Sequence, residues 1–208
     1  MWISSEDRLA SGYSLDVKKY RELEIDNPIM LAVLQDRILD EDVDFRGNLL
    51  SLPIKRRLLI RDEKRDIELE PQDIGVGISQ VLPVVVSALH HKTGLIAIEQ
   101  PELHIHPAFQ VALGDLFIEQ VRECPNLIFI LETHSEHLML RFLRRIREAS
   151  EQDVPENRKL IPDDLSIYFV EQAETGISCM PIRVDQDGDF IDRWPKGFFA
   201  ERAKELFS

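Results

Sequence analysis

The chain has 208 residues, of which 44% are hydrophobic and 30% charged, a composition that excludes a disordered or fibrous protein and suffices for one main domain. Its formal net charge of −13 opposes nonspecific attraction to nucleic acid, because affinity for phosphate backbones comes from Lys and Arg. The two cysteines are too few for a disulfide framework or a thiolate metal site.

The longest apolar runs, such as Val81–Leu89, fall well short of the roughly 20 residues that a membrane-spanning helix needs. The first residues, MWISSEDRLASGYS, lack a positive region followed by an apolar region, so they carry no secretory signal pattern. We therefore expect a cytoplasmic protein without a membrane contact.

The first predicted elements are a helix and a hairpin. Asn27 is a suitable N-cap with Pro28 at the first helical position, and apolar residues then recur at helical spacing, which predicts an amphipathic helix to about Asp40. Two short apolar runs, Leu58–Ile60 and Ile67–Leu69, flank the polar sequence DEKRD. They predict a surface hairpin or two short strands with a scaffold role.

The middle of the chain alternates between predicted helices and strands. We expect helices over residues 79–91, 108–122 and 136–148, and strands at Leu95–Glu99 and Leu127–Leu131. Short apolar strands that alternate with amphipathic helices are typical of parallel strands layered with helices. The expected fold class is therefore α/β.

A polar, proline-containing stretch, Ser150–Asp164, precedes two strand-like segments, LSIYFVE and SCMPIRVD, and a turn at Gln186–Gly188. The chain then runs through Trp194–Phe199 into a predicted short helix, AERAKELF. We expect the aromatic side chains of this tail to anchor it to the body of the protein, with a partner-binding tail as the alternative.

The expected division of the chain is an N-terminal region 1–72, an α/β lobe 73–150, and a linker with a small α+β segment 151–208.

Glu99 is the first candidate for chemistry, because it ends the apolar run LIAI. In α/β nucleotide hydrolases, an acidic residue at the C-terminal end of a buried strand holds Mg²⁺, since a hard cation prefers oxygen ligands. Taken alone, Glu99 fits better with an exposed strand-end carboxylate, which any α/β protein possesses.

Two further segments have polar groups near predicted element ends. The glycines of Gly75–Gln80 free backbone N–H groups, and Ser79 lies at a positive helix N-terminus, a geometry suited to an anion. Thr133–Ser135 places His134 at the end of a neighbouring strand. On its own the glycine pair is more often a plain turn, and such a histidine is usually a cap or a packed residue.

Four motifs that follow one another in the chain strengthen the functional interpretation of these candidates: GVGISQVLP, IEQPELHIHP, ETHSEHL and the terminal WPKGFF. Their order and spacing resemble the second half of an ABC-type ATPase head of the SMC/RecF/OLD-like branch, and most closely bacterial AAA-family ATPases with an uncharacterised C-terminal domain. The resemblance covers roughly Asp73–Ser208. It implies a partial ABC-ATPase-like head that uses ATP and Mg²⁺.

The resemblance also implies a role for each motif residue. Glu99 takes the acidic position linked to Mg²⁺ in the Walker B strand, Gln100 the position of the usual catalytic glutamate, and His134 that of the switch histidine. Residues 101–106 form the D-loop. The implied signature loop, which in this family contacts the γ-phosphate of ATP held by the opposite protomer of a head-to-tail dimer, contains Gly75, Gly77, Ser79 and Gln80.

Two departures from the family pattern limit the expected activity. A glutamine at position 100 can orient water but cannot accept its proton, so we expect slow hydrolysis unless Glu102 substitutes as the base. No glycine begins a GxxxxGK[ST] match. Without such a P-loop the β- and γ-phosphates lack their backbone amides and lysine, so we expect this chain alone neither to bind ATP tightly nor to hydrolyse it.

Two hypotheses follow. In the first, the chain is a partial head completed by an N-terminal P-loop lobe or a complete ATPase protomer, and relatives in phage defence or DNA maintenance suggest its setting. In the second, it is a noncatalytic regulatory or interaction module that docks on a complete ATPase.

Two weaker alternatives rest on clustered side chains. A metal-dependent hydrolase would take its ligands from His104, His106, Glu99, Glu102, His134 and His137. A basic patch could contact nucleic acid or an acidic partner, and it comprises Arg141, Arg144, Arg145 and Arg147. A solvated helix face paired with local acidic residues is the more usual interpretation of such a patch.

Overall fold

The structure is a computed structural model that describes Ser4, Leu9 and residues 11–34, 45–151, 155–173 and 176–195. The chain forms two compact units, one of Met1 and Gly12–Ile74 and one of Trp2–Ser11 and Gly75–Ser208. The predicted end of the first helix near Asp40, residues 196–199 of the terminal motif and the predicted AERAKELF helix lie outside the described residues.

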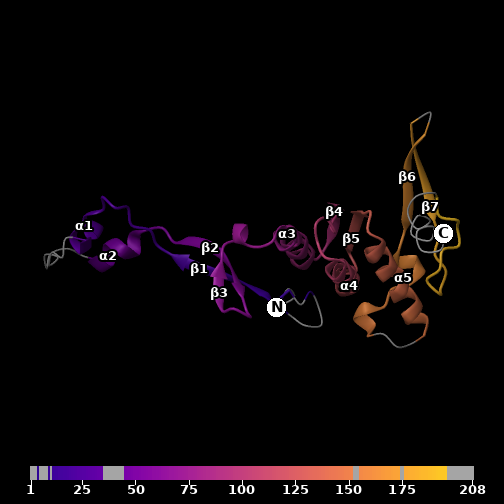
Figure 1. Ribbon diagram of the computed structural model, residues 1–208, viewed down its shortest axis with the longest axis horizontal. Coiled ribbons are helices and arrows are strands. Elements are labelled where there is room, and N and C mark those ends of the chain that lie inside the picture. The colour runs from indigo at the N-terminus through magenta and orange to yellow at the C-terminus, as the bar shows by residue number, and fades with distance from the viewer. Residues whose placement is uncertain are drawn as a thin grey trace. The chain divides into compact units, whose positions relative to one another are not determined.

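The first unit contains a three-stranded antiparallel sheet in the order β1–β2–β3 (Figure 1). Its strands are β1 (Tyr13–Tyr20), β2 (Lys55–Asp62) and β3 (Ile67–Leu69). The predicted hairpin is confirmed, because β2 and β3 pair with Ile60 opposite Leu69. A third strand, β1, was not predicted; it pairs with β2 along its whole length.

Two short helices, α1 (Pro28–Leu34) and α2 (Phe45–Ser51), lie between β1 and β2 in the chain. The predicted N-cap is confirmed: the side-chain oxygen of Asn27 accepts a hydrogen bond from the N–H of Ile29 at 3.0 Å. The helix α2 was not predicted.

The second unit contains the parallel pair β4 (Gly94–Glu99) and β5 (Leu127–Glu132). Both strands and their parallel direction are as predicted, and the α/β fold class is confirmed. The helices of this lobe are α3 (Val76–His90), α4 (Pro107–Glu123) and α5 (Glu136–Ser150). Within the described ranges, no helix is long and apolar enough to cross a membrane.

Local capping explains where α4 and α5 begin. The ring nitrogen Nδ1 of His106 accepts a hydrogen bond from the N–H of Ala108, and Pro107 occupies the first helical position. The hydroxyl of Ser135 caps α5 by accepting a hydrogen bond from the N–H of Leu138 at 2.9 Å. The apolar stripe of α5 is buried, and it comprises Met139, Phe142, Leu143 and Ile146.

The two faces of the β4–β5 pair differ. On one face, Phe129 of β5 packs against Phe117 of α4, with ring centroids 4.9 Å apart. The opposite face, which we call the open face, presents Leu95, Ile128 and Ile130 with 55–62% of their surface exposed. Parallel sheets are generally covered on both faces, so the open face is unusual.

The two predicted C-terminal strands are β6 (Ile167–Ala173) and β7 (Gly176–Ile182), and they pair antiparallel, which the sequence did not indicate. Ile167 and Ile182 pack against Met139 and Leu143 of α5 in one buried cluster. Single-turn 3-10 helices occur at Pro71–Asp73, Glu156–Arg158 and Pro162–Asp164.

A buried ion-pair network joins α4 and α5. Both oxygens of Asp115 accept hydrogen bonds from Arg141 and Arg145, at 2.5–2.9 Å. Arg144 pairs with Glu148, and Arg147 with Asp189. The predicted basic patch is therefore paired with local acids, and Arg145 is buried rather than solvated.

Burial alone would raise the pKa of Asp115, but the guanidinium groups of Arg141 and Arg145 outweigh burial and lower it below the usual carboxyl range. A carboxyl whose pKa is lowered by folding stabilises the fold fully above its unfolded pKa of about 3.9. This stabilisation is lost as the pH falls below that value.

We predict that Asp115→Ala lowers the free energy of unfolding by about 3 kcal/mol, because it removes the carboxylate that Arg141 and Arg145 share and leaves the buried Arg145 with Glu148 as its remaining acidic partner. Urea unfolding at neutral pH measures the loss. Asp189→Ala is the matched control in the same unit, since Asp189 forms an exposed ion pair with Arg147 of α5, and it should cost at most about 1 kcal/mol. Equal losses in the two variants would contradict the role of the network.

Candidate functional site

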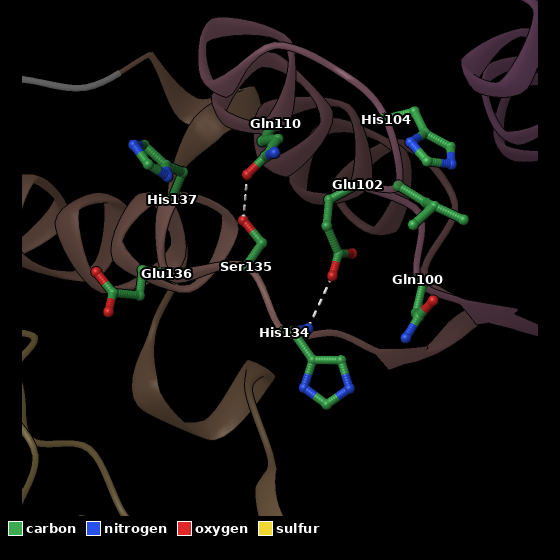
Figure 2. Close-up of a pocket in the computed structure, with 9 residues that line it drawn as sticks. Gln100, Glu102, His104, Gln110, His134, Ser135, Glu136 and His137 are labelled. Carbon is green, nitrogen blue, oxygen red and sulfur yellow. Dashed lines mark hydrogen bonds between the residues drawn. The ribbon is translucent and has the colours of Figure 1, made fainter. Parts of the chain in front are cut away.

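A hollow of about 500 Å³ lies beside the loops that follow β4 and β5 (Figure 2). Because the two strands are parallel, their C-terminal ends meet at one edge of the sheet, where α/β folds bind ligands. The residues that line it are Gln100, Glu102, Leu103, His104, Gln110, His134, Ser135, Glu136 and His137. It thus brings together Gln100, Glu102 and His134, the three predicted catalytic residues.

The loop of residues 100–106 leaves β4 through an unusual backbone turn. The N–H of Gln100 donates to the carbonyl of Glu132 at 2.8 Å, and the N–H of Leu103 donates to the carbonyl of Gln100 at 3.0 Å. Gln100 and His104 have φ angles of +46° and +59°, a left-handed conformation that is uncommon for residues other than glycine. Such conformations cluster at functional sites.

Glu102 connects the two loops of the hollow. Its Oε1 atom accepts a hydrogen bond from the backbone N–H of His134 at 2.7 Å, and Figure 2 shows the carboxylate directed at that nitrogen. Its Oε2 atom is buried and has no hydrogen-bond partner among the described residues. A buried carboxylate oxygen without a partner is costly, so this atom is suited to a ligand.

A second connection runs through Gln110 of α4. The hydroxyl of Ser135 donates to the side-chain oxygen of Gln110 at 2.6 Å (Figure 2). The side-chain nitrogen of Gln110 donates to the carbonyl of Ile105 at 3.1 Å. Gln110 therefore links the 100–106 loop to the start of α5. Gln110 was not predicted, because it belongs to none of the four motifs.

Glu99, the predicted Mg²⁺ ligand, does not line the hollow. It is the last residue of β4, directly opposite Glu132 of β5, and both residues are exposed. Because side chains alternate along a strand, Glu99 shares the open face with Leu95. Glu132 is a neighbouring carboxylate that the sequence analysis did not consider, and its signal was its place at the end of the second strand.

An Mg²⁺ ion fits this edge only in part. The carboxylate oxygens of Glu99, Glu102 and Glu132 are of the type that Mg²⁺ prefers, and Mg²⁺ is commonly held by one or two carboxylates with substrate phosphates and water. Within the described residues, no three or more His, Cys, Asp or Glu side chains lie close enough to hold a metal ion by themselves. This geometry gives no support to the metal-dependent hydrolase alternative.

The glycine segment differs from its prediction. Gly75 is the N-cap of α3, so Gly77, Ser79 and Gln80 lie in its first turns rather than in a loop before a helix at residue 79. The Ser79 hydroxyl donates to the carbonyl of Val76 at 2.9 Å, within the helix. None of the four predicted nucleotide-contacting residues lines the hollow.

Gly77 nevertheless connects α3 to the site. A Cβ atom at this position would lie 2.7 Å from the carbonyl oxygen of His104, which is closer than non-bonded atoms approach. The first turn of α3 thus packs directly on the backbone of the 100–106 loop, and only glycine permits this approach.

We predict that Gly77→Ala destabilises the chain by about 1–2 kcal/mol, because the clash with the His104 carbonyl outweighs the higher helix propensity of alanine. Gly75→Ala is the control, because a Cβ there would have no neighbour within 4 Å; it should cost less than about 1 kcal/mol. Urea unfolding followed by circular dichroism compares the two variants. An equal or smaller loss for Gly77→Ala would contradict this packing.

Comparisons with known families cover most of the chain. Residues 8–140 match the model of a family described as "AAA domain, putative AbiEii toxin, Type IV TA system". This match is more than half of the chain and includes β4, β5 and the hollow. Residues 160–208 match a family described as a protein of unknown function, DUF3696. No curated protein matches the chain.

Proposed function

The chain belongs to the AAA-domain family that matches residues 8–140, and on this premise we propose that it is a partial nucleotide-binding ATPase head. It binds and hydrolyses ATP, with Mg²⁺, when a P-loop lobe and a head-to-tail partner complete it. The observation that carries the proposal is the convergence of Gln100, Glu102 and His134 on one hollow at the C-terminal edge of a parallel strand pair.

Glu102 is the residue we assign as the base. Its Oε2 atom is buried without a partner, while its Oε1 atom is held by the backbone of His134. A carboxylate fixed in this way can accept a proton from water, whereas the amide of Gln100 can only orient the water. His134 would then contact the γ-phosphate, as a switch histidine does, with its ring as a donor.

Glu99 is the residue we assign to Mg²⁺, with Glu132 beside it at the strand ends. The bound ion would neutralise charge on the phosphates. The carboxylates at this edge would supply one or two ligands, and phosphate oxygens and water the rest.

The open face supports the need for a further lobe. Leu95, Ile128 and Ile130 expose more than half of their surface, although parallel strands are usually buried on both faces. The open face also ends at Glu99 and Glu132, so a lobe packed on it would bring its phosphate-binding groups to the carboxylates. The 208 residues contain no GxxxxGK[ST] match, so we assign the P-loop to that lobe.

The start of α3 is the surface we assign to the opposite protomer. Gly75, Gly77, Ser79 and Gln80 lie outside the hollow, as expected of a signature segment that acts on a partner's nucleotide. AAA ATPases commonly oligomerise. A role in phage defence or DNA maintenance, with nucleic acid as a further partner, fits the family resemblance.

The alternative is a noncatalytic regulatory or interaction module. Gln100 at the catalytic position is the observation that favours it, because an amide cannot serve as the base. Such a module would associate with a complete ATPase in a nucleotide-dependent way and would add no turnover of its own.

The test is ATP turnover by the purified chain, by a P-loop lobe of the same family, and by their mixture. We predict turnover only in the mixture, and about a 100-fold decrease for Glu102→Gln, since a general base contributes roughly 10²–10⁴-fold. Glu151→Gln, the same change at an exposed residue beyond α5, should have no effect.

Absence of ATP turnover in the mixture would refute the proposal of a partial ATPase head and favour the interaction module. Full turnover with Glu102→Gln would refute Glu102 as the base, while leaving the head intact. Turnover by the chain alone would refute the requirement for a second lobe.

A further inference from the structure

A chain of hydrogen bonds passes through the side chain of Gln110, at the wall of the hollow. The N–H of Leu138 donates to the hydroxyl oxygen of Ser135 at 2.9 Å. This hydroxyl donates to the side-chain oxygen of Gln110 at 2.6 Å (Figure 2), and the side-chain nitrogen of Gln110 donates to the carbonyl of Ile105 at 3.1 Å. The donors all point the same way along this chain, so each bond polarises the next and strengthens it.

The carbonyl of Ile105 needs the donor that Gln110 supplies. The N–H groups of Phe109 and Gln110 donate to the carbonyl of His106, so the carbonyl of Ile105 lies one residue before the hydrogen-bond pattern of α4. Ile105 is buried, and a buried carbonyl is stable only with a donor. Because an amide has a donor and an acceptor on one carbon atom, the same side chain also holds Ser135.

Glu102 and Gln110 hold two neighbouring residues of the loop that follows β5. Glu102 accepts a hydrogen bond from the N–H of His134, and Gln110 accepts one from the hydroxyl of Ser135 (Figure 2). The bond to Glu102 ends on a carboxylate, so its strength depends on the charge of that group. The bond to Gln110 ends on a neutral amide, which does not titrate.

We propose that Gln110 is a positioning residue of the site, which holds His134 against the 100–106 loop while Glu102 acts as the base. This inference rests on the proposed function, because it gives Gln110 a part in ATP turnover. When Glu102 accepts the proton of the attacking water, its carboxylate loses its charge and its bond to the His134 N–H weakens. The bond from Ser135 to Gln110 keeps its strength, so the backbone of His134 stays in place through the proton transfer.

The place of Gln110 on α4 suits this role. It lies near the start of a 17-residue helix whose next turns are fixed by the buried Leu113 and Leu116 and by the ion pairs of Asp115 with α5. Side chains on a rigid helix hold a site more precisely than side chains on a loop. Gln110 therefore fixes the loop after β5 to the rigid part of the lobe, which Glu102, itself a loop residue, cannot do alone.

Hydrogen exchange of single backbone amides, measured by NMR on the full chain, tests this positioning without ATP. Gln110→Met keeps a long unbranched side chain but removes both hydrogen bonds. We expect the His134 amide to exchange at least about tenfold faster in this variant, since a local opening that breaks the Glu102 bond becomes easier. The amides of the β4–β5 ladder should keep their rates.

Gln120→Met is the matched control, because it makes the same change on the same helix. Gln120 is 2% exposed, its side-chain nitrogen donates to Glu123 at 3.3 Å, and it does not line the hollow. The His134 amide should exchange in this control as it does in the unmodified chain.

ATP turnover with the P-loop lobe gives the second readout. We expect Gln110→Met to lower kcat about 10–100-fold and to leave KM within about twofold, because a misplaced group slows the chemical step more than it weakens ATP binding. Gln110→Asn should show the same loss, since its amide is one methylene too short to hold both Ser135 and Ile105. Gln120→Met should turn over ATP normally.

His134 exchange that Gln110→Met leaves unchanged, or that accelerates equally throughout the β4–β5 ladder, would overturn the positioning role. Equal losses of kcat in Gln110→Met and Gln120→Met, or a loss confined to KM, would also overturn it. Gln110→Asn provides both readouts if Gln110→Met does not fold. Absence of turnover in the unmodified mixture would overturn the ATPase head and the part of Gln110 in turnover, whereas the exchange rates would still decide whether Gln110 holds His134.

Discussion

The parallel pairing of β4 and β5 is the constraint on which the site depends. It places Glu99 opposite Glu132, so the loops that follow the two strands leave from one edge of the sheet. The hydrogen bond from the His134 backbone to Glu102 and the bridge from Ser135 to Gln110 are short-range consequences of that shared edge. An antiparallel pair would place the two loops at opposite ends of the sheet.

The same pairing explains why one face of the sheet is covered and supports the site, whereas the other face is open. Packing of Phe129 on Phe117 covers one face of the sheet. The close approach of Gly77 to the His104 carbonyl holds the 100–106 loop against α3. The open face has no such cover and exposes Ile128 and Ile130. The ordered half of the site and the surface that would receive its other half therefore belong to the same two strands.

Local patterns predicted most of the α/β lobe, because strands β4 and β5 and helices α4 and α5 follow hydrophobic periodicity and capping residues such as Ser135. β1 was missed although Tyr13, Leu15 and Val17 alternate with polar residues, and its pairing with β2 fixes its length. The start of α3 depends on a distant partner as well: α3 begins at Val76 because Gly75 caps it and Gly77 packs on a later loop.

The candidate site was predicted to a similar degree. Family motifs placed Gln100, Glu102 and His134, and the fold brings these three together. Gln110 and Glu132 carry no motif, and only the three-dimensional register places them at the same edge. The basic face of α5 likewise gave no indication that Asp115 of α4 is the ion-pair partner of Arg141 and Arg145.

If the chain is half of an ATPase head, a P-loop lobe binds to its open face. Isothermal titration calorimetry would compare the unmodified chain with Ile130→Glu on the open face and Ile191→Glu elsewhere, since both isoleucines are 55% exposed. We expect binding that only Ile130→Glu weakens, by at least about tenfold. Equal binding by all three chains, or binding by none, would contradict it.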